Sequence, residues 1–278
     1  MNNFIRNYDQ SVKTPWLANY GKVPFHIEYP QGSMVETIKQ IAALYPDYIA
    51  FDFMGRSTSF RQFYADICLA ARSFAAAGIG EDDRVTICMP NSPQGVCCFY
   101  ALNMLGAVAN MIHPLSSEGE IIFYLKDSGS VAALTLDQFY PKFAAIVAEV
   151  KLPCLIITSI GDALSPVKKL GYQLTEGKKI APIPTDAPNV IMWKDFLAGG
   201  KAYTGSYQVL RRGEDPAAIL YSGGTSGATK GILLSNLNFN ALSQQTITMD
   251  TNFKPGDKML AVMPMFHGFG LGVCLHTF

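Results

Sequence analysis

The sequence predicts an α/β fold in which helices cover both faces of a doubly wound, mostly parallel sheet. Four apolar segments begin at residues 84, 108, 131 and 154, so that successive starts are 24, 23 and 23 residues apart. This spacing suits a strand, a turn and a crossover helix. The segments are continuously apolar, as strands buried on both faces are. The pattern lapses too early for an eight-stranded barrel, which favours an open sheet.

Two helices are predicted ahead of this repeat. Ser33 and Glu36 have the spacing of a capping box, and apolar residues then recur at helical spacing until Pro46. A second apolar stripe runs from Phe60 to Phe74, and Gly78 stands where a left-handed C-terminal cap belongs.

Strands and helices alternate within the repeat. We expect strands at 84–89, 108–112, 131–136 and 154–158, and helices at 93–105, 117–126 and 139–150. Prolines and glycines between Gly161 and Gly213 predict a long irregular excursion with one short helical piece at 193–197. A strand at 217–221 then resumes the pattern.

The composition excludes several classes of function. The 278 residues include 22 basic and 22 acidic side chains, so the chain lacks the positive surface that nucleic-acid binding requires. The longest apolar stretch, residues 96–112, is interrupted by polar residues and falls short of the roughly 20 residues of a membrane span. The N-terminus has no apolar core with a cleavage site. We therefore expect a cytoplasmic protein without a transmembrane segment, for which peripheral membrane contact remains open.

A glycine-rich loop follows the strand at 217–221 and reads YSGGTSGATKG from Tyr221 to Gly231. Its glycines let backbone N–H groups approach an anion, its hydroxyls add donors, and Lys230 adds a positive charge. The loop leads into the apolar residues Ile232-Leu233-Leu234 rather than into a helix, unlike the usual NTPase loop. We expect strand, loop and strand, with Ser235 or Asn236 capping a later helix. A plain hairpin turn is the alternative.

The order of residues in this loop resembles the phosphate-binding motif of the adenylate-forming superfamily, usually YTSGTTGxPKG. Four further segments resemble that family in the same order along the chain. They are 57–60 (family TYxEL), 80–92 (GEDDRVTICMPNS here, KGDRVAILLPNS in the family), 104–114 (KAGAVxVPLNP) and 263–270 (MPMFHGFG here, LPLFHxxG in the family). The resemblance thus covers nearly the whole chain.

Two departures from the usual motif point to one subgroup of this family. Gly223 replaces the usual serine and Thr229 the usual proline, a variant similar to that of bacterial long-chain fatty-acyl-CoA ligases. The opening Pro15-Trp16-Leu17 with Tyr20 resembles the PWLxxY start of the same enzymes. A fatty acid is therefore the implied substrate. An aryl- or amino-acid-adenylating enzyme, and a non-catalytic nucleotide- or acyl-binding module, are the alternatives.

The resemblance implies a two-step reaction. A carboxylate attacks the α-phosphorus of ATP to give an acyl adenylate and pyrophosphate, and the acyl group then passes to the thiol of coenzyme A. The implied cofactors are ATP, Mg²⁺ and coenzyme A. The residues implied to wrap the β- and γ-phosphates are Ser222, Gly223, Gly224, Thr225, Ser226 and Gly227. Thr225 would also contact Mg²⁺, Lys230 would steady the loop or the phosphates, and Tyr221 would support the loop.

The histidine of the segment 263–270 also has an implied role. The family residue that matches His267 lies beside the substrate carboxylate and orients the acyl group or gates its access. A histidine satisfied by backbone contacts is the alternative. The neighbouring Phe266 and Phe269 would line an acyl channel or pack in the core. His26, His113 and His276 lack metal-ligand spacing and are interpreted as structural or solvent-facing.

Motifs that follow the histidine segment in the family are absent from this sequence. They are the YGxTE segment with its metal-binding glutamate, the TGD segment that holds the ribose, and the small C-terminal domain. We therefore expect an incomplete N-terminal part of an acetyl-CoA-synthetase-like large domain that cannot complete adenylation alone and whose partner is the missing C-terminal half. The expected division is an N-terminal segment at 1–80, the α/β subdomain at 81–250, and the start of a second subdomain at 251–278.

Overall fold

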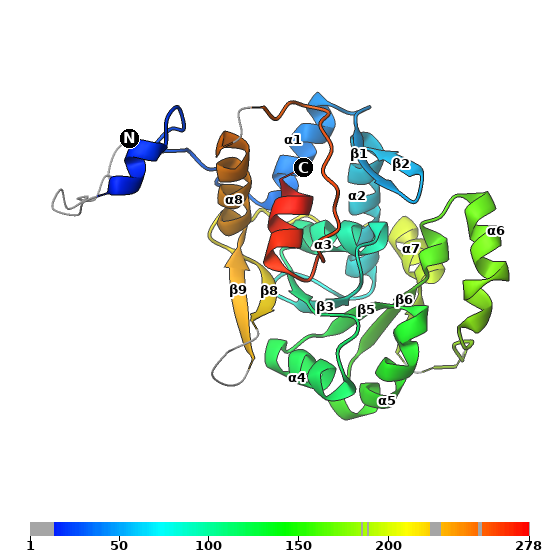
Figure 1. The fold of residues 1–278 in the computed structure, drawn as a ribbon. Coiled ribbons are helices and arrows are strands. Elements are labelled where there is room, and N and C mark those ends of the chain that lie inside the picture. Colours follow the sequence, from blue (N-terminus) through cyan, green and yellow to red (C-terminus); the bar gives the residue numbers. More distant parts are fainter. Residues whose placement is uncertain (1–13, 185, 188, 223–228, 250–251, 278) are drawn as a thin grey trace.

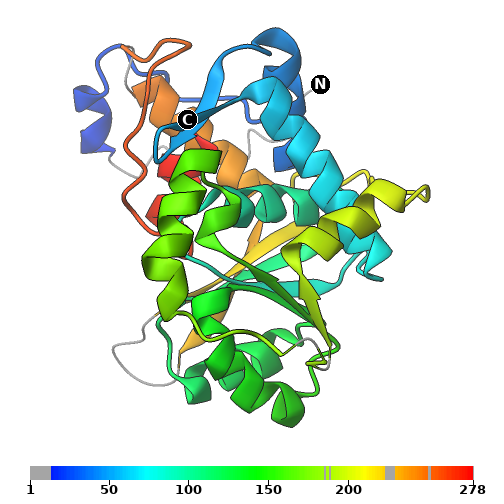
Figure 2. The same ribbon diagram turned by 90° about the vertical axis from the view of Figure 1, so that its right-hand side faces the viewer.

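A mixed sheet lies between two layers of helices in the computed structural model, which describes residues 14–184, 186–187, 189–222, 229–249 and 252–277 (Figure 1; Figure 2). Its strand order is β7-β6-β5-β3-β4-β8-β9, and all neighbours are parallel except β8 and β9. The strands are β3 (Arg84–Cys88), β4 (Val108–Met111), β5 (Ala132–Leu136), β6 (Cys154–Thr158), β7 (Val190–Met192), β8 (Pro216–Ser222) and β9 (Lys230–Ser235). The predicted doubly wound, mostly parallel sheet is confirmed.

Helices cover both faces of this sheet. Successive side chains of a strand point to opposite faces, and here the side chains on both faces are mostly apolar. Ile87 of β3 belongs to the core beneath α2, α3 and α7, whereas its neighbour Cys88 belongs to the core beneath α4 and α5. The bounds of the helices are α1 (Met34–Leu44), α2 (Phe60–Ala76), α3 (Pro93–Leu105), α4 (Glu118–Ser128), α5 (Tyr140–Val150), α6 (Pro166–Leu174), α7 (Trp193–Ala202) and α8 (Asn236–Met249). Figure 2 shows the two helical layers on opposite sides of the strands.

The helices begin and end where their capping residues predict. Ser33 and Ser117 each form a capping box with the glutamate three residues later, at the starts of α1 and α4. Gly106 and Gly129 have positive φ angles of 73° and 63° and end α3 and α4. Local side-chain chemistry therefore decides these boundaries.

The expectation of an irregular excursion between Gly161 and Gly213 is wrong. This stretch contains α6, the edge strand β7 and α7, which is longer than the predicted piece. The glycines inside α7 resemble those of a loop, which explains the error. Gly200 is instead required by the close packing of α7 on α2. A Cβ there would lie 2.7 Å from the backbone nitrogen of Ser73 and 2.8 Å from the carbonyl oxygen of Leu69.

A two-stranded hairpin between the first two helices was not predicted. Strands β1 (Ile49–Phe53) and β2 (Arg56–Ser59) pair antiparallel around a two-residue turn. Met54 and Gly55 have φ angles of 52° and 79°, as a type I′ turn requires. The sequence signal for this hairpin was Gly55 at the second position of a two-residue loop. Met54 at the first position weakened it, because asparagine, aspartate or glycine is usual there.

Helix α8 is joined to distant segments by one buried carboxamide. Asn236 accepts hydrogen bonds from the backbone of Met34 (3.1 Å) and from the side chain of Asn103 (2.7 Å), and donates to the carbonyls of Arg212 and Asp215 (both 3.2 Å). Its side chain is fully buried. Four polar groups from three distant segments of the chain therefore depend on one side chain for hydrogen bonds.

A second buried network holds the π-helical segment Phe269–His276. The side-chain nitrogen of Asn240 donates to the carbonyls of Pro30 and Gly32, which leaves its oxygen as an acceptor 3.1 Å from Nε2 of His276. Nε2 must then carry the proton, and Nδ1 accepts from the hydroxyl of Tyr100 at 3.1 Å. His276 is thus a buried, neutral, structural histidine, which decides between the two roles left open for it.

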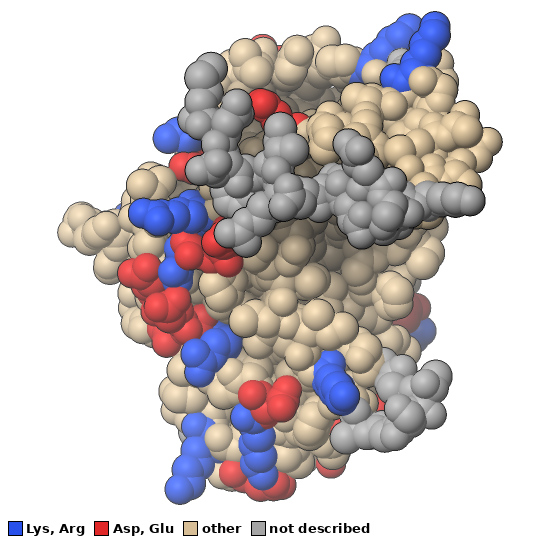
Figure 3. Space-filling view, turned by 90° about the vertical axis from the view of Figure 1, so that its left-hand side faces the viewer, with Lys and Arg blue, Asp and Glu red and all other residues tan. Residues whose placement is uncertain are grey.

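The face formed by β9, α8 and the segment that follows α8 carries few charges (Figure 3). Its exposed large apolar side chains are Ile232, Leu233, Ile247, Met249, Met259, Leu260, Val262 and Met263. No helix in the described part of the chain is both long enough and apolar enough to cross a bilayer.

Replacing Asn236 with alanine should lower the free energy of unfolding by about 2–4 kcal/mol, because four polar partners, two of them buried, lose their hydrogen bonds. Chemical denaturation measures the change. Asn238→Ala is the matched control: this exposed side chain only caps the start of α8 and should cost about 1 kcal/mol or less. Equal losses in the two variants would contradict the role assigned to Asn236.

Stability should fall as the pH decreases from 6.5 to 4. Burial lowers the pKa of His276 to about 4 from its ordinary 6.5, so in this window the unfolded chain binds a proton that the folded chain does not. The expected loss from this residue is about 3 kcal/mol. Denaturation at several pH values should show a shallower slope in His276→Gln than in the wild type, and parallel slopes would exclude this origin.

Candidate functional site

The glycine-rich loop is held between two paired strands. β8 and β9 pair antiparallel up to Ser222 and Lys230, which lie opposite each other. The predicted order of strand, loop and strand is therefore correct. Of the residues predicted to bind phosphate, Tyr221, Ser222 and Lys230 are brought together at the ends of the loop. Gly223, Gly224, Thr225, Ser226 and Gly227 lie outside the described residues.

Lys230 is exposed at the mouth of the loop. None of the described residues forms an ion pair or a hydrogen bond with its ammonium group, unlike the lysines at 126, 169 and 179, which pair with carboxylates. Its charge is therefore available to an external anion.

Tyr221 fastens the first end of the loop to α4. Its single hydroxyl proton has two acceptors within reach, the carbonyl of Tyr124 and Oδ2 of Asp127, both at 3.3 Å. Its ring lies 4.2 Å from the ring of Tyr124, centroid to centroid. Burial, followed by the charge of Asp127, raises the pKa of Tyr221 well above its ordinary value. The phenol therefore stays protonated and acts as a donor.

Gly231 permits this contact at the other end of the loop. A Cβ on Gly231 would lie 3.1 Å from Oδ2 of Asp127, 3.2 Å from Cγ2 of Ile219 and 3.2 Å from Cε1 of Tyr221. Any side chain there would push against the Tyr221–Asp127 contact. The close approach of β9 to β8 and α4 explains this glycine, since its φ angle is not positive.

Asn91 holds the segment that carries the predicted histidine. Its side-chain nitrogen donates to the carbonyls of Ala261 (2.8 Å) and Met263 (2.9 Å), and its oxygen accepts from the backbone of Met265 (2.7 Å). Asn91 directly follows the turn after β3, so it ties one sheet edge to a segment about 170 residues later. Asn91 lies in the family-like segment 80–92, but its role depends on distant partners that the sequence does not indicate.

His267 follows this anchored stretch and has an exposed side chain. The next residue, Gly268, lies against β8, since a Cβ there would be 3.7 Å from Cδ1 of Leu220. Phe266 packs against the ring of His113 at 4.3 Å, whereas Phe269 is 53% exposed. Because β3, β4 and β8 are parallel, their carboxyl ends meet at one sheet edge. Residues 261–268 contact Asn91 after β3, His113 after β4 and Leu220 of β8, so the histidine segment lies at this edge.

Metal ligands of the usual kinds do not cluster in this region. Within the described ranges, no group of three His, Cys, Asp or Glu side chains is arranged to hold a metal ion. Thr225, the predicted Mg²⁺ contact, lies in the part of the loop that is not described.

Replacing Asn91 with alanine should loosen residues 261–267, because three backbone groups lose their partner. We expect faster hydrogen exchange and proteolysis there, with a stability loss of about 1–3 kcal/mol. Asn91→Asp is an informative comparison, since it keeps the acceptor for Met265 and loses both donors. Unchanged exchange at 261–267 in both variants would contradict the anchoring role.

The family model described as AMP-binding enzyme matches residues 38–278. The chain is 29% identical over 264 residues to the long-chain-fatty-acid–CoA ligase of Bacillus subtilis, covering 94% of this chain and 47% of that protein. It is also 29% identical over 277 residues to the enzyme of the same name from Escherichia coli O157:H7, covering 95% and 48%. The chain thus spans about half the length of these relatives.

Solved structures agree with this fold. A long-chain-fatty-acid-CoA ligase from Archaeoglobus fulgidus has a TM-score of 0.70 and 20% identity, covering 90% of this chain and 46% of that one. The anthranilate CoA ligase AuaEII, in complex with anthranoyl-AMP, also has a TM-score of 0.70, with 18% identity and coverage of 93% and 44%. Because the family model matches most of the chain, this protein belongs to the family of AMP-binding enzymes.

Proposed function

We propose that this chain binds the β- and γ-phosphates of ATP in an enzyme that activates a fatty acid as an acyl adenylate and transfers it to coenzyme A. The observation that carries the proposal is the β8–β9 hairpin, in which Lys230, without a described partner, faces Ser222 across the mouth of the glycine-rich loop. Relatives that bear the name long-chain-fatty-acid–CoA ligase support the reaction class.

The hairpin suits the stabilisation of a leaving pyrophosphate. When a carboxylate attacks the α-phosphorus, negative charge grows on the β- and γ-phosphates that depart. A donor fixed before the reaction stabilises that charge without a reorganisation cost. Strand pairing and the Tyr221 contact with α4 fix both ends of the loop. Ser222 and Lys230 can thus act as positioned donors, while Tyr221 serves as their support.

A magnesium ion would neutralise phosphate oxygens in this reaction. Mg²⁺ commonly uses few protein ligands together with substrate phosphates and water, which fits a site where the described residues offer no carboxylate cluster. Thr225 is the residue of this chain that we propose as its contact.

His267 is proposed to orient the acid. Its side chain is exposed, and its backbone is fixed by the hydrogen bond from its N–H to the carbonyl of Pro264 (3.0 Å). The residue is therefore positioned, yet its imidazole is accessible to a carboxylate. Of the two phenylalanines beside it, the exposed Phe269 is the better candidate for an acyl-channel wall, because Phe266 already packs against His113.

The class of acid can be tested directly. The protein expressed from the whole gene should form a thioester from palmitate, ATP and coenzyme A far faster than from anthranilate or from an amino acid. A preference for anthranilate would favour the aryl alternative, which the fold shared with AuaEII leaves open. Binding of ATP without thioester formation from any acid would favour a nucleotide-binding module.

In the same protein, Lys230→Ala and Thr225→Ala should each lower kcat/KM for ATP by about 10²–10³-fold, because donors to the leaving group are lost. Pyrophosphate release measures the rate, and circular dichroism checks folding. Lys178→Ala, which removes an exposed lysine near α6, should leave the kinetics unchanged. Wild-type kinetics in both loop variants would remove the loop from the mechanism.

A further inference from the structure

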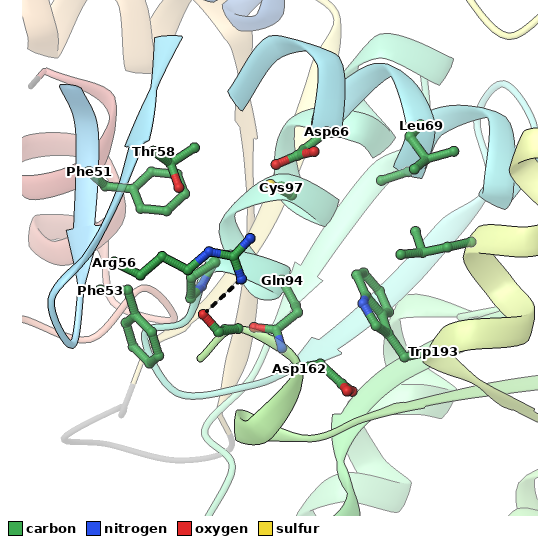
Figure 4. Close-up of a pocket in the computed structure, with 14 residues that line it drawn as sticks. Phe51, Phe53, Arg56, Thr58, Asp66, Leu69, Gln94, Cys97, Asp162 and Trp193 are labelled. Atoms are coloured by element: carbon green, nitrogen blue, oxygen red, sulfur yellow. Dashed lines mark hydrogen bonds between the residues drawn. The ribbon is translucent and has the colours of Figure 1, made fainter. Parts of the chain in front are cut away.

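A cavity of about 180 Å³ lies on the other side of β3 from the glycine-rich loop (Figure 4). Its walls come from the β1–β2 hairpin, α2, the start of α3, the turn after β6, and α7. The side chains important here are Phe51, Phe53, Arg56, Asp66, Gln94 and Trp193. None of them takes part in the proposed reaction.

One wall of the cavity carries a polar atom that lacks a partner. The side-chain nitrogen of Gln94 donates to Oγ1 of Thr158 (3.2 Å) and to the carbonyl of Ser159 (2.9 Å). Since a carbonyl can only accept, these contacts fix which end of the carboxamide is nitrogen. The remaining Oε1 has no hydrogen bond to any described residue, although Gln94 is only 5% exposed. A buried acceptor of this kind can take a hydrogen bond from a bound water or from a ligand.

Two opposite charges face the same space without pairing. The guanidinium of Arg56 donates to the carbonyl of Ala163 at 3.2 Å, and Asp66 accepts from Gln62 at 2.7 Å. Arg56 and Asp66 are close enough to influence each other but form no ion pair, and burial raises the pKa of Asp66. By contrast, Asp162 is paired with Lys169 and bonded to Ser159. Arg56 and Asp66 thus both line the cavity without an ion-pair partner among the described residues.

The rest of the lining is aromatic. Figure 4 shows Phe51 and Phe53 on one side of the cavity and Trp193 on the other, with Arg56 and Gln94 between them. An apolar cavity of about 150 Å³ can hold a benzene molecule, so this space suits a ligand of that size or slightly larger. The walls thus offer a cation, two acceptors and apolar surface within a small volume.

We propose that this cavity binds a small zwitterion, an α-amino acid with a compact apolar side chain such as valine. Its carboxylate matches the guanidinium of Arg56, its ammonium group matches the acceptors on Asp66 and Gln94, and its side chain contacts the aromatic wall. A plain cation would face Arg56, and a plain anion would face Asp66. The site is separate from the loop at 222–230 and does not depend on the proposed function.

Binding to the protein without ATP tests the proposal by calorimetry or saturation-transfer NMR. L-valine should bind at least about tenfold more tightly than isobutylamine, which lacks the carboxylate, or isovalerate, which lacks the amine. Asp66→Asn and Arg56→Gln should each weaken valine binding by about tenfold or more. Asp47→Asn and Arg61→Gln are the controls. They make the same kinds of substitution in an exposed ion pair that does not line the cavity, and both variants should bind valine as the wild type does.

Three results would overturn the proposal. The first is no valine binding at millimolar concentration, which would leave water as the occupant of the cavity. The second is equal binding of valine and either truncated analogue, which would show that paired charges are not recognised. The third is undiminished valine binding in both Asp66→Asn and Arg56→Gln, each confirmed as folded by a cooperative thermal transition.

Discussion

Six neighbouring strands run in one direction, so the loops that follow them emerge at one edge of the sheet. This constraint decides where chemistry can occur in the molecule. The glycine-rich loop follows β8, Asn91 follows β3, and Asp162 follows β6, so all three reach the same edge from different parts of the sequence. The antiparallel β9 departs from the pattern because it must return from the loop beside β8.

Buried or partly buried asparagine side chains join segments that are distant in the sequence. Asn91, Asn236 and Asn240 each donate and accept at once, and each bridges segments more than 100 residues apart. An asparagine can satisfy carbonyls and an N–H group together without introducing charge. Such side chains specify one arrangement of the loops, since no apolar residue of similar size can replace their hydrogen bonds.

Local patterns were sufficient to predict most of the fold. The capping boxes at Ser33 and Ser117 and the apolar periodicity of the central strands depend only on near neighbours in the sequence. The errors arose where tertiary contacts decide. Gly200 resembles a loop residue but serves the packing of α7 on α2. The three-residue β7 is too short to produce a distinct apolar run and forms only because β6 is beside it.

The sequence predicted the residues that flank the loop of the candidate site, but not the long-range contacts that hold them. The motif order indicated which residues flank the loop, and the strand that follows Lys230 excluded the common NTPase arrangement. The contact of Tyr221 with Asp127 and the three hydrogen bonds of Asn91 were not predictable, because their partners lie 94 and about 170 residues away. Composition cannot show such pairs. They require the fold that brings α4 beside β8 and the histidine segment beside β3.

The turn from β3 into α3 stands between the two sites inferred from the structure. Asn91 faces the histidine segment, Ser92 caps α3, and Gln94 forms part of the cavity wall. Gly95 in the same turn leaves room for Met265, since a Cβ there would lie 2.9 Å from its sulfur. A shift of this one helical turn would therefore change both the anchorage of His267 and the shape of the cavity. The connection from β3 to α3 therefore links the anchorage of the histidine segment to one wall of the cavity through a few hydrogen bonds.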